Sequence, residues 1–167
     1  MFHVKKGLTA LIFIGLAAAG LYWADGQTED GLWETLEYHL LPDPMANNTY
    51  DAGECTYHVF EKVKAQGDMI ETSWRDADQW AENAAADGYT VNDEPKIGAI
   101  LQTERGELGH VAYIESINED GSINISEMNY TEPYEVTERT IAADNIDRYS
   151  YIHPKENPRP KDLEEQA

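Results

Sequence analysis

The sequence contains a single cysteine, Cys55, among its 167 residues. One thiol cannot form a disulfide within the chain, so no such bridge stabilises the fold. The sequence also lacks a CxxC pair and an HExxH motif, which excludes the commonest zinc-binding patterns. A lone thiol in an exported protein is a buried spectator, half of an intermolecular disulfide or a reactive nucleophile. Composition alone leaves these three alternatives open.

Positive charge is also scarce. The chain has 12 Lys and Arg residues against 32 Asp and Glu residues, a formal net charge of -20. This balance excludes nucleic acid as a partner, because binding phosphates requires a basic patch. It argues equally against peripheral binding to anionic lipid. An acidic surface favours solubility and does not by itself indicate a function.

The only long apolar run, residues 8–24, follows two lysines near the N-terminus. Basic residues before an apolar stretch are typical of an export signal. Residues 17–19 (AAA) offer a cleavage site for a signal peptide, whereas Tyr22 and Trp23 suit the membrane interface of an uncleaved anchor. We favour the anchor, which would tether the chain to a membrane. Either interpretation predicts an extracellular or cell-envelope location for the remainder.

The sequence divides into four predicted parts. Residues 1–24 are the signal peptide or membrane anchor, and residues 25–48 are an acidic linker with one short amphipathic helix. Residues 49–153 form the predicted domain. Residues 154–167 contain three prolines and many charges, which predict a disordered tail.

Within the domain, predicted helices come first and predicted strands afterwards. Apolar spacing predicts a helix from Cys55 to a stop at Gly67 and a second helix over residues 76–87. Strands are predicted over residues 97–101, 110–117 and 122–130, with a last edge strand over residues 149–152. Helices followed by an antiparallel sheet define the α+β class.

The turn sequence NEDG joins two of these strands into a predicted hairpin, because Asp-Gly between alternating residues is typical of such turns. Residues two apart on a strand share a face. A four-residue loop therefore pairs Ile117 with Ser122 and places His110 opposite Asn129. One face then carries His110, Glu127 and Asn129 at one end and aliphatic side chains at the other. We expect the N-terminal helices to cover the aliphatic end.

Cys55 lies at the predicted start of the first helix, where free backbone N–H groups and the helix dipole favour a thiolate. A catalytic thiolate needs a neighbouring imidazole, and that ring needs a third group to fix its tautomer. His110 is the candidate base, and Glu127 or Asn129 is the candidate acceptor for its second nitrogen. His58, on the same helix as Cys55, is the alternative histidine. Spacing alone leaves a purely structural role for His110 equally open.

Five short segments resemble one known family. They are residues 53–57 (GECTY), 80–84 (WAENA), 98–100 (GAI), 109–113 (GHVAY) and 126–130 (SEMNY). In this order they resemble the CHAP domain, the cysteine, histidine-dependent amidohydrolase/peptidase domain of bacterial and phage peptidoglycan hydrolases. The resemblance spans about residues 50–152 and is strongest to the secretory-antigen branch of Gram-positive bacteria.

The resemblance implies a papain-like α+β fold and a bacterial enzyme. Its chemistry requires no metal or cofactor, and we find no calcium-binding loop in the sequence. It implies Cys55 as nucleophile, His110 as base, and Glu127 with Asn129 as orienting residues. The implied reaction is hydrolysis of an amide bond in peptidoglycan through an acyl-thioester. The bond belongs either to an N-acetylmuramoyl-L-alanine linkage or to a peptide cross-bridge. We expect a monomer whose partner is the stem peptide or cross-bridge.

The chain departs from this family at Glu54, where many members have glutamine before the cysteine. An ionised carboxylate there would repel an oxyanion, unless the side chain points away or is protonated. A catalytically inactive module for binding or assembly at the cell surface is therefore one alternative. An enzyme of the same fold that acts on a different amide is another.

Overall fold

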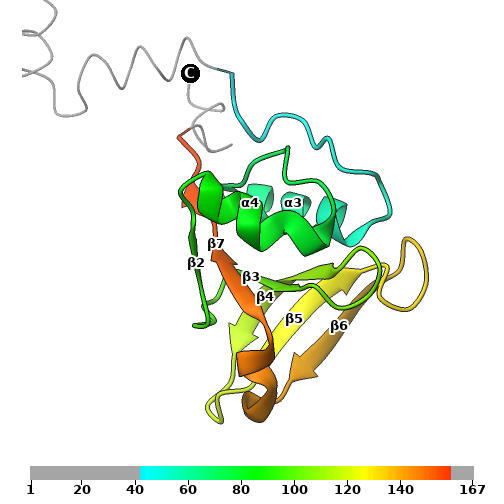
Figure 1. The fold of residues 1–167 in the computed structure, drawn as a ribbon, viewed down its shortest axis with the longest axis vertical. Coiled ribbons are helices and arrows are strands. Elements are labelled where there is room, and N and C mark those ends of the chain that lie inside the picture. The colour runs from blue at the N-terminus through cyan, green and yellow to red at the C-terminus, as the bar shows by residue number, and fades with distance from the viewer. Residues whose placement is uncertain (1–41, 159–167) are drawn as a thin grey trace, which may run out of the picture. The chain divides into compact units, whose positions relative to one another are not determined.

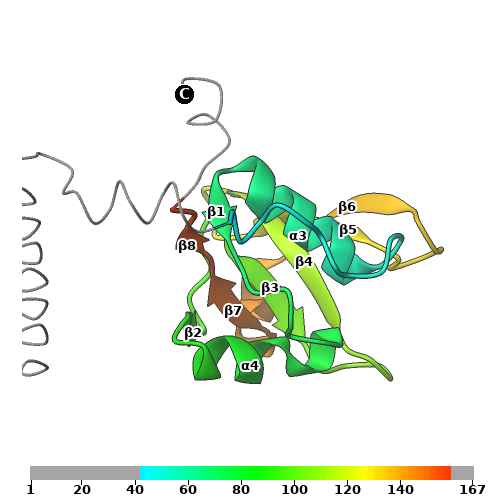
Figure 2. The same ribbon diagram turned by 90° about the horizontal axis from the view of Figure 1, so that it is seen from above.

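The computed structural model describes residues 42–158, and its two α-helices lie on the same side of a twisted sheet (Figures 1 and 2). The helical segments are α3 (Cys55–Ala65), the 3₁₀ turn η1 (Ala77–Gln79), α4 (Trp80–Ala86) and a second 3₁₀ segment, η2 (Ala143–Arg148). Element labels follow Figure 1. Within the described range, no helix is long and apolar enough to cross a membrane. The predicted anchor over residues 8–24 lies outside that range.

Helix α3 begins at the predicted residue. Glu54 is its N-cap, and the chain leaves the helix through Gly67, whose φ of +81° favours glycine. One side of the helix buries Val59, Phe60 and Val63 completely. The second predicted helix, over residues 76–87, is present as η1 followed directly by α4.

The strands form one large and one small antiparallel sheet. The large sheet has the order β2-β7-β3-β4-β5-β6, and the small one pairs β1 with β8. The strands are β1 (Asp68–Met69), β2 (Thr90–Asn92), β3 (Ile100–Thr103), β4 (His110–Ile117), β5 (Ile123–Met128), β6 (Val136–Ile141), β7 (Ser150–His153) and β8 (Lys155–Glu156). Helices packed on an antiparallel sheet confirm the predicted α+β class.

Three strand predictions need correction. The strand predicted from residue 97 starts only at Ile100, because the Ala99 N–H closes a turn onto the Lys96 carbonyl and Gly98 has a φ of +84°. β7 is not an edge strand, since it pairs with both β2 and β3. β6 was not predicted, because its only apolar residues, Val136 and Ile141, lie at its two ends and leave no apolar alternation between them.

The register of the β4–β5 hairpin differs from the prediction near the turn and agrees with it farther away. Ile117 pairs with Ile123, not with the predicted Ser122, so the turn is one residue longer than expected. A bulge between Ile114 and Ser116 then shifts the register back. Beyond the bulge Tyr113 pairs with Ser126, the register that the four-residue loop predicts. The two irregularities cancel before the strands reach the candidate site.

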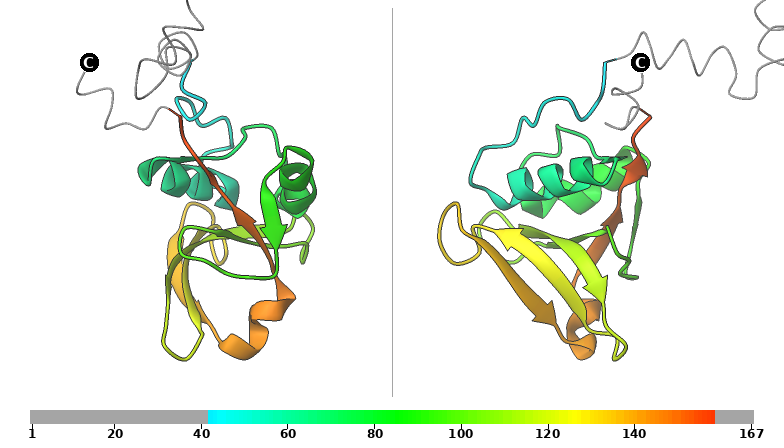
Figure 3. Two further views of the ribbon diagram at one scale, coloured as in Figure 1. Left: turned by 90° about the vertical axis from the view of Figure 1, so that its left-hand side faces the viewer. Right: turned by 180° about the vertical axis from the view of Figure 1, so that it is seen from behind.

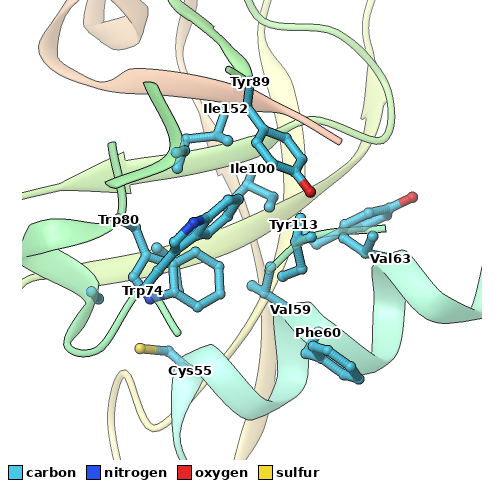
Figure 4. Close-up of a cluster of buried hydrophobic side chains, with 14 of the residues drawn as sticks. Cys55, Val59, Phe60, Val63, Trp74, Trp80, Tyr89, Ile100, Tyr113 and Ile152 are labelled. Atoms are coloured by element: carbon cyan, nitrogen blue, oxygen red, sulfur yellow. The ribbon is translucent and has the colours of Figure 1, made fainter. Parts of the chain in front are cut away.

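The sheet has a buried cluster of apolar side chains on each face, and the helices cover only one of them. Figure 4 shows the cluster under α3, where Val59 and Trp74 pack with Tyr113 from the sheet. Ala112 and Ile114, the neighbours of Tyr113 on β4, point to the opposite face and belong to the other cluster. The expectation that the helices cover this His110 face is therefore wrong. The strongly twisted sheet brings side chains of its own strands together there, with η2 packed against them (Figure 3).

The described fold extends on both sides of residues 49–153. Met45 is fully buried in the cluster under α3, and the Asn157 side chain donates to the Asp43 carboxylate at 3.0 Å. β8 pairs with β1 after residue 153. Most of the predicted linker, including its short helix, and residues 159–167 of the predicted tail lie outside the described residues.

Candidate active site

Cys55 is the first residue of α3 and lies at one end of the buried cluster that Figure 4 shows. Its side chain is buried and forms no disulfide. The first N–H groups of a helix have no carbonyl partners within it, and the side chain of the N-cap Glu54 does not bond to them. The thiol is therefore placed where backbone N–H groups face a developing negative charge.

His110 begins β4 and lies between the Cys55 thiol and a carboxylate. Its Nε2 atom is 2.8 Å from Oε2 of Glu127. Cys55 is the second group that acts on the ring, since its side chain contributes to the raised pKa of His110. Because Nε2 is occupied by Glu127, Nδ1 is the nitrogen left for the sulfur. The structure thus brings Cys55, His110 and Glu127 together from a helix start, a strand start and the neighbouring strand β5.

The surroundings of His110 favour its charged form. Burial of the ring lowers its pKa, but the hydrogen bonds to Cys55 and Glu127, with the attraction of both groups, outweigh burial. Together these contributions raise the pKa of His110 to about 9. The imidazole is therefore protonated at neutral pH, as a thiolate–imidazolium pair requires.

Glu127 is a fully buried carboxylate that Arg139 and His110 share. Arg139 donates from Nε to Oε1 at 2.5 Å and from Nη2 to Oε2 at 3.2 Å. Burial raises the pKa of Glu127, but the hydrogen bonds from His110 and Arg139 lower it below its usual value. A buried carboxylate is tolerated when it is paired in this way. Glu127 therefore stays ionised beside the imidazole.

Tyr130 covers the outer side of this group. Its ring centroid lies 5.4 Å from that of His110, and the Arg139 guanidinium lies 4.2 Å from it. Just over half of the residue's surface remains exposed, at 55%. The ring shields the His110–Glu127–Arg139 group from one side and presents an aromatic surface to a ligand.

Asn129 does not bond to His110 in this structure. Its side-chain Nδ2 donates to Oε2 of Glu54 at 2.7 Å. The residue has a φ of +58°, which ends β5 and turns its side chain out of the strand's alternation. Of the two candidate acceptors for the histidine, Glu127 makes the contact.

The loop over residues 129–135 lies against the segment that precedes Cys55. The Tyr134 N–H donates to the Gly53 carbonyl at 3.3 Å. Gly53 has a φ of +97°, and a Cβ there would lie 2.5 Å from the Tyr134 ring. Glycine is thus required both for the backbone conformation and for the close approach of the ring. With the Asn129–Glu54 bond, this contact fixes one wall beside the thiol.

His58, the alternative histidine, lies elsewhere. It is buried against the sheet, with Nε2 2.9 Å from Oγ of Ser126. Burial and the nearby Lys62 lower the pKa of His58, so its neutral form is favoured. His58 therefore fills a structural position between α3 and β5.

Sequence reasoning missed Arg139 and the pairing of Asn129 with Glu54. Arg139 lies on the unpredicted strand β6, where Ile125 is its partner across the sheet. An arginine within a polar strand gives no sequence signal of an inward role. Among residues 42–158 no group of three or more His, Cys, Asp or Glu side chains is placed to hold a metal ion.

Comparison with known proteins identifies the family. The CHAP domain family matches residues 45–129, half of this sequence, and the chain belongs to that family. The chain is similar to the probable autolysin SsaALP of Staphylococcus aureus, with 52% identity over 107 residues, or 64% of this chain and 40% of that protein. It is also similar to the staphylococcal secretory antigen SsaA of the same organism, with 49% identity over 108 residues, or 64% of this chain and 41% of that protein. The matched part therefore spans about two fifths of these relatives.

A solved structure shows the same arrangement of elements. The crystal structure of an N-acetylmuramoyl-L-alanine amidase from Staphylococcus aureus matches 65% of this chain and 34% of that protein, with a TM-score of 0.60 and 34% identity. This match agrees with the papain-like α+β fold that the resemblance implies.

Proposed function

We propose that this chain is an exported cysteine amidohydrolase that cuts an amide bond of bacterial peptidoglycan. The observation that carries the proposal is the part-buried His110, held at 2.8 Å by Glu127 and raised in pKa by its interactions with both Glu127 and Cys55. Nucleophile, base and orienting group in this order suit acyl transfer through a thiol. Membership of the CHAP family supports peptidoglycan as the substrate.

In the proposed reaction the Cys55 thiolate attacks the carbonyl carbon of the scissile amide. The His110 imidazolium then donates its proton to the leaving nitrogen, which breaks the C–N bond and leaves an acyl-thioester. Neutral His110 next takes a proton from water, whose oxygen attacks the thioester and restores the thiolate. Cys55 and His110 thus return to their starting protonation states.

Glu127 and Arg139 are assigned positioning roles. Glu127 fixes the tautomer and the plane of the His110 ring and stabilises its positive charge. Arg139 donates two hydrogen bonds to Glu127, which holds that carboxylate in one orientation and keeps it ionised. Neither group needs to touch the substrate.

The oxyanion is assigned to backbone N–H groups at the start of α3, with that of Cys55 first among them. We assign Asn129 a different role from the one that the resemblance implies, which was to orient His110. The bond of Asn129 to Glu54 holds the carboxylate toward the loop over residues 129–135, which offsets the repulsion expected from a glutamate beside the nucleophile.

The names of the relatives support export of the chain and the kind of amide bond that it cuts. Two relatives are named an autolysin and a secretory antigen, which agrees with export by the N-terminal segment. The solved structure carries the name of an N-acetylmuramoyl-L-alanine amidase, so we propose that amide first and a peptide cross-bridge second. The part of the wall polymer that the enzyme binds is then the stem peptide.

Incubation of the full chain with defined peptidoglycan, followed by mass spectrometry of the products, tests the proposal. We expect new L-alanine amino termini, or new cross-bridge termini, from the unmodified chain and none from Cys55→Ser. No new terminus from any wall type would contradict the proposal. In that case an ordinary, slow reaction of Cys55 with iodoacetamide near pH 6 would favour an inactive binding module.

A further inference from the structure

A polar hollow lies at the end of β3, the strand that neighbours β4, and has no role in the proposed reaction. Its volume is about 320 Å³, and two arginines face it. It is lined by Gln102, Thr103, Glu104, Arg105, Arg148 and Ser150. These residues come from the end of β3, the loop after it, the end of η2 and the start of β7.

The strand register places this hollow close to the candidate base. Thr103, on its lining, is the β3 residue that pairs with His110 on β4. Neighbouring strands lie about 4.8 Å apart, so the hollow begins one strand away from the imidazole. Ser150 pairs with Gln102 on the other side of β3. A ligand that lies across this end of the sheet passes from His110 to the arginines within two strand spacings.

The arginines of this hollow are available to a ligand. Among residues 42–158, the guanidiniums of Arg105 and Arg148 form no ion pair, whereas that of Arg139 is paired with Glu127. Glu104 is the one acidic residue on the lining, so the hollow has a local excess of positive charge in a chain of net charge -20. A free guanidinium presents a planar fork of N–H donors that matches a carboxylate.

The backbone that carries Arg105 is held in place. The Arg105 N–H donates to Oγ1 of Thr103 at 3.3 Å. The other end of the loop is fixed where the Asp78 N–H donates to the Leu108 carbonyl at 2.9 Å. Below the loop, the buried Gln102 amide donates to the carbonyls of η1 at 3.0 and 3.2 Å. A site with a fixed backbone loses less entropy when it binds a ligand.

We propose that this hollow is a subsite for a carboxylate of the substrate peptide, with Arg105 and Arg148 as its donors. The inference rests on the proposed function in one respect, namely that the ligand is the peptide whose amide Cys55 cuts. A carboxylate anchored two strands from His110 positions the chain of the peptide across the thiol. The subsite therefore selects acidic stem peptides over amidated ones.

Binding of two synthetic peptides tests the subsite apart from catalysis. The full chain with Cys55→Ser is titrated calorimetrically with L-Ala-D-Glu-L-Lys-D-Ala-D-Ala, and with the same peptide after amidation of all its carboxylates. We expect the acid to bind about tenfold or more tightly, as charge-assisted hydrogen bonds to guanidinium imply. Arg105→Gln together with Arg148→Gln should remove this preference. Lys96→Gln, an exposed charge before the other end of β3, is the control and should leave the preference unchanged.

Each outcome supports or overturns the proposed subsite. Equal binding of the two peptides, no binding at millimolar concentration, or a preference that survives loss of both arginines would overturn it. Hydrolysis of peptidoglycan by the chain with Cys55 intact is measured separately. If that chain cuts nothing while the arginines still set the preference, the proposed function fails and the subsite stands. If it cuts acidic peptide and the arginine variants keep the same KM, the subsite fails and the function stands.

Discussion

Arg139 bonds both oxygens of Glu127, with Nε 2.5 Å from Oε1 and Nη2 3.2 Å from Oε2, the oxygen that also contacts His110. The carboxylate is fully buried, so these two cations are its principal partners. Arg139 thus adds a fourth residue to the expected series of cysteine, histidine and carboxylate. The orientation of the imidazole therefore also depends on an arginine from the edge strand β6.

The first prediction concerns this arginine. Replacement of Arg139 by Met leaves Glu127 buried with one partner fewer, which costs about 1–3 kcal/mol in the free energy of unfolding. We expect kcat for peptidoglycan hydrolysis to fall at least about tenfold with little change in KM, because a positioning residue does not touch the substrate. Denaturant unfolding and steady-state kinetics measure the two effects.

Arg139→Lys is the matched control for charge. Lysine keeps the positive charge but cannot donate the bidentate pair, so we expect its stability to lie near that of the unmodified chain and its kcat to lie between the other two. If Arg139→Met changes KM and leaves kcat intact, the arginine contacts substrate and the positioning role is wrong.

The second prediction concerns pH. The pKa of His110 is raised to about 9, so the imidazolium persists at neutral pH and is lost as pH rises through that value. Activity should therefore decline on the alkaline side near pH 9. The charged ring also contributes stability that is fully present below its unfolded pKa, about 6.5, and is lost as pH rises through 9.

Glu127→Gln tests whether deprotonation of His110, and not of another group, causes the alkaline loss of activity. The neutral amide removes one of the interactions that raise the pKa of His110, so the alkaline limb of the activity profile should move to lower pH. The profile of kcat/KM, and an NMR titration of the imidazole in both chains, measure the shift. An alkaline limb that stays in place in Glu127→Gln means that another group controls it.

The third prediction concerns Glu54 and Asn129. If Asn129 holds the Glu54 carboxylate away from the nucleophile, Asn129→Ala frees that charge and lowers kcat by roughly tenfold, comparable to one lost charge-assisted hydrogen bond. Adding Glu54→Gln to Asn129→Ala removes the charge and should restore most of kcat. The double-mutant cycle gives the coupling between the two residues.

Glu54→Gln alone serves as the control and should be as active as the unmodified chain or more so. A loss in Glu54→Gln equal to the loss in Asn129→Ala would mean that the carboxylate assists the reaction. A double variant no more active than Asn129→Ala would assign Asn129 a contact with the substrate or with His110.

The sequence predicted the parts of the site that depend on local pattern. β4 lies where alternating apolar residues and the Asp-Gly turn predict it, and Cys55 begins a helix because an apolar stripe starts there. Once the register is known, strand alternation places His110 and Glu127 on the same face of the sheet. The predicted register holds at that end only because the bulge between Ile114 and Ser116 offsets the longer turn.

The parts that the sequence did not predict depend on contacts between distant segments. β6 has no strong apolar alternation, so neither that strand nor the inward role of Arg139 left a sequence signal. Asn129 was expected to follow the alternation of β5, but its left-handed backbone ends the strand at Met128, two residues before the predicted end. Which face the helices cover was also mispredicted, because the twist of the sheet is a property of all six strands.

The last prediction concerns the glycine before the base. Gly109 has a φ of +70°, and a Cβ there would lie 2.4 Å from the backbone nitrogen of Asp78. Gly106, in the same loop, has a φ of +98° and nothing within 4 Å of its Cβ position. Alanine at either position costs about 1–2 kcal/mol for the left-handed backbone. Only at position 109 does it also push against backbone that cannot move freely.

Gly109→Ala should therefore be less stable than Gly106→Ala. It should also lose about 100-fold in kcat, because displacement of β4 by about 1 Å misplaces His110 relative to the thiol. Gly106→Ala, which also places alanine at a positive φ but without a clash, should keep its activity. Thermal unfolding and kcat measured on both chains decide the matter. Equal activity of the two variants would show that the contact between Gly109 and Asp78 does not position the imidazole.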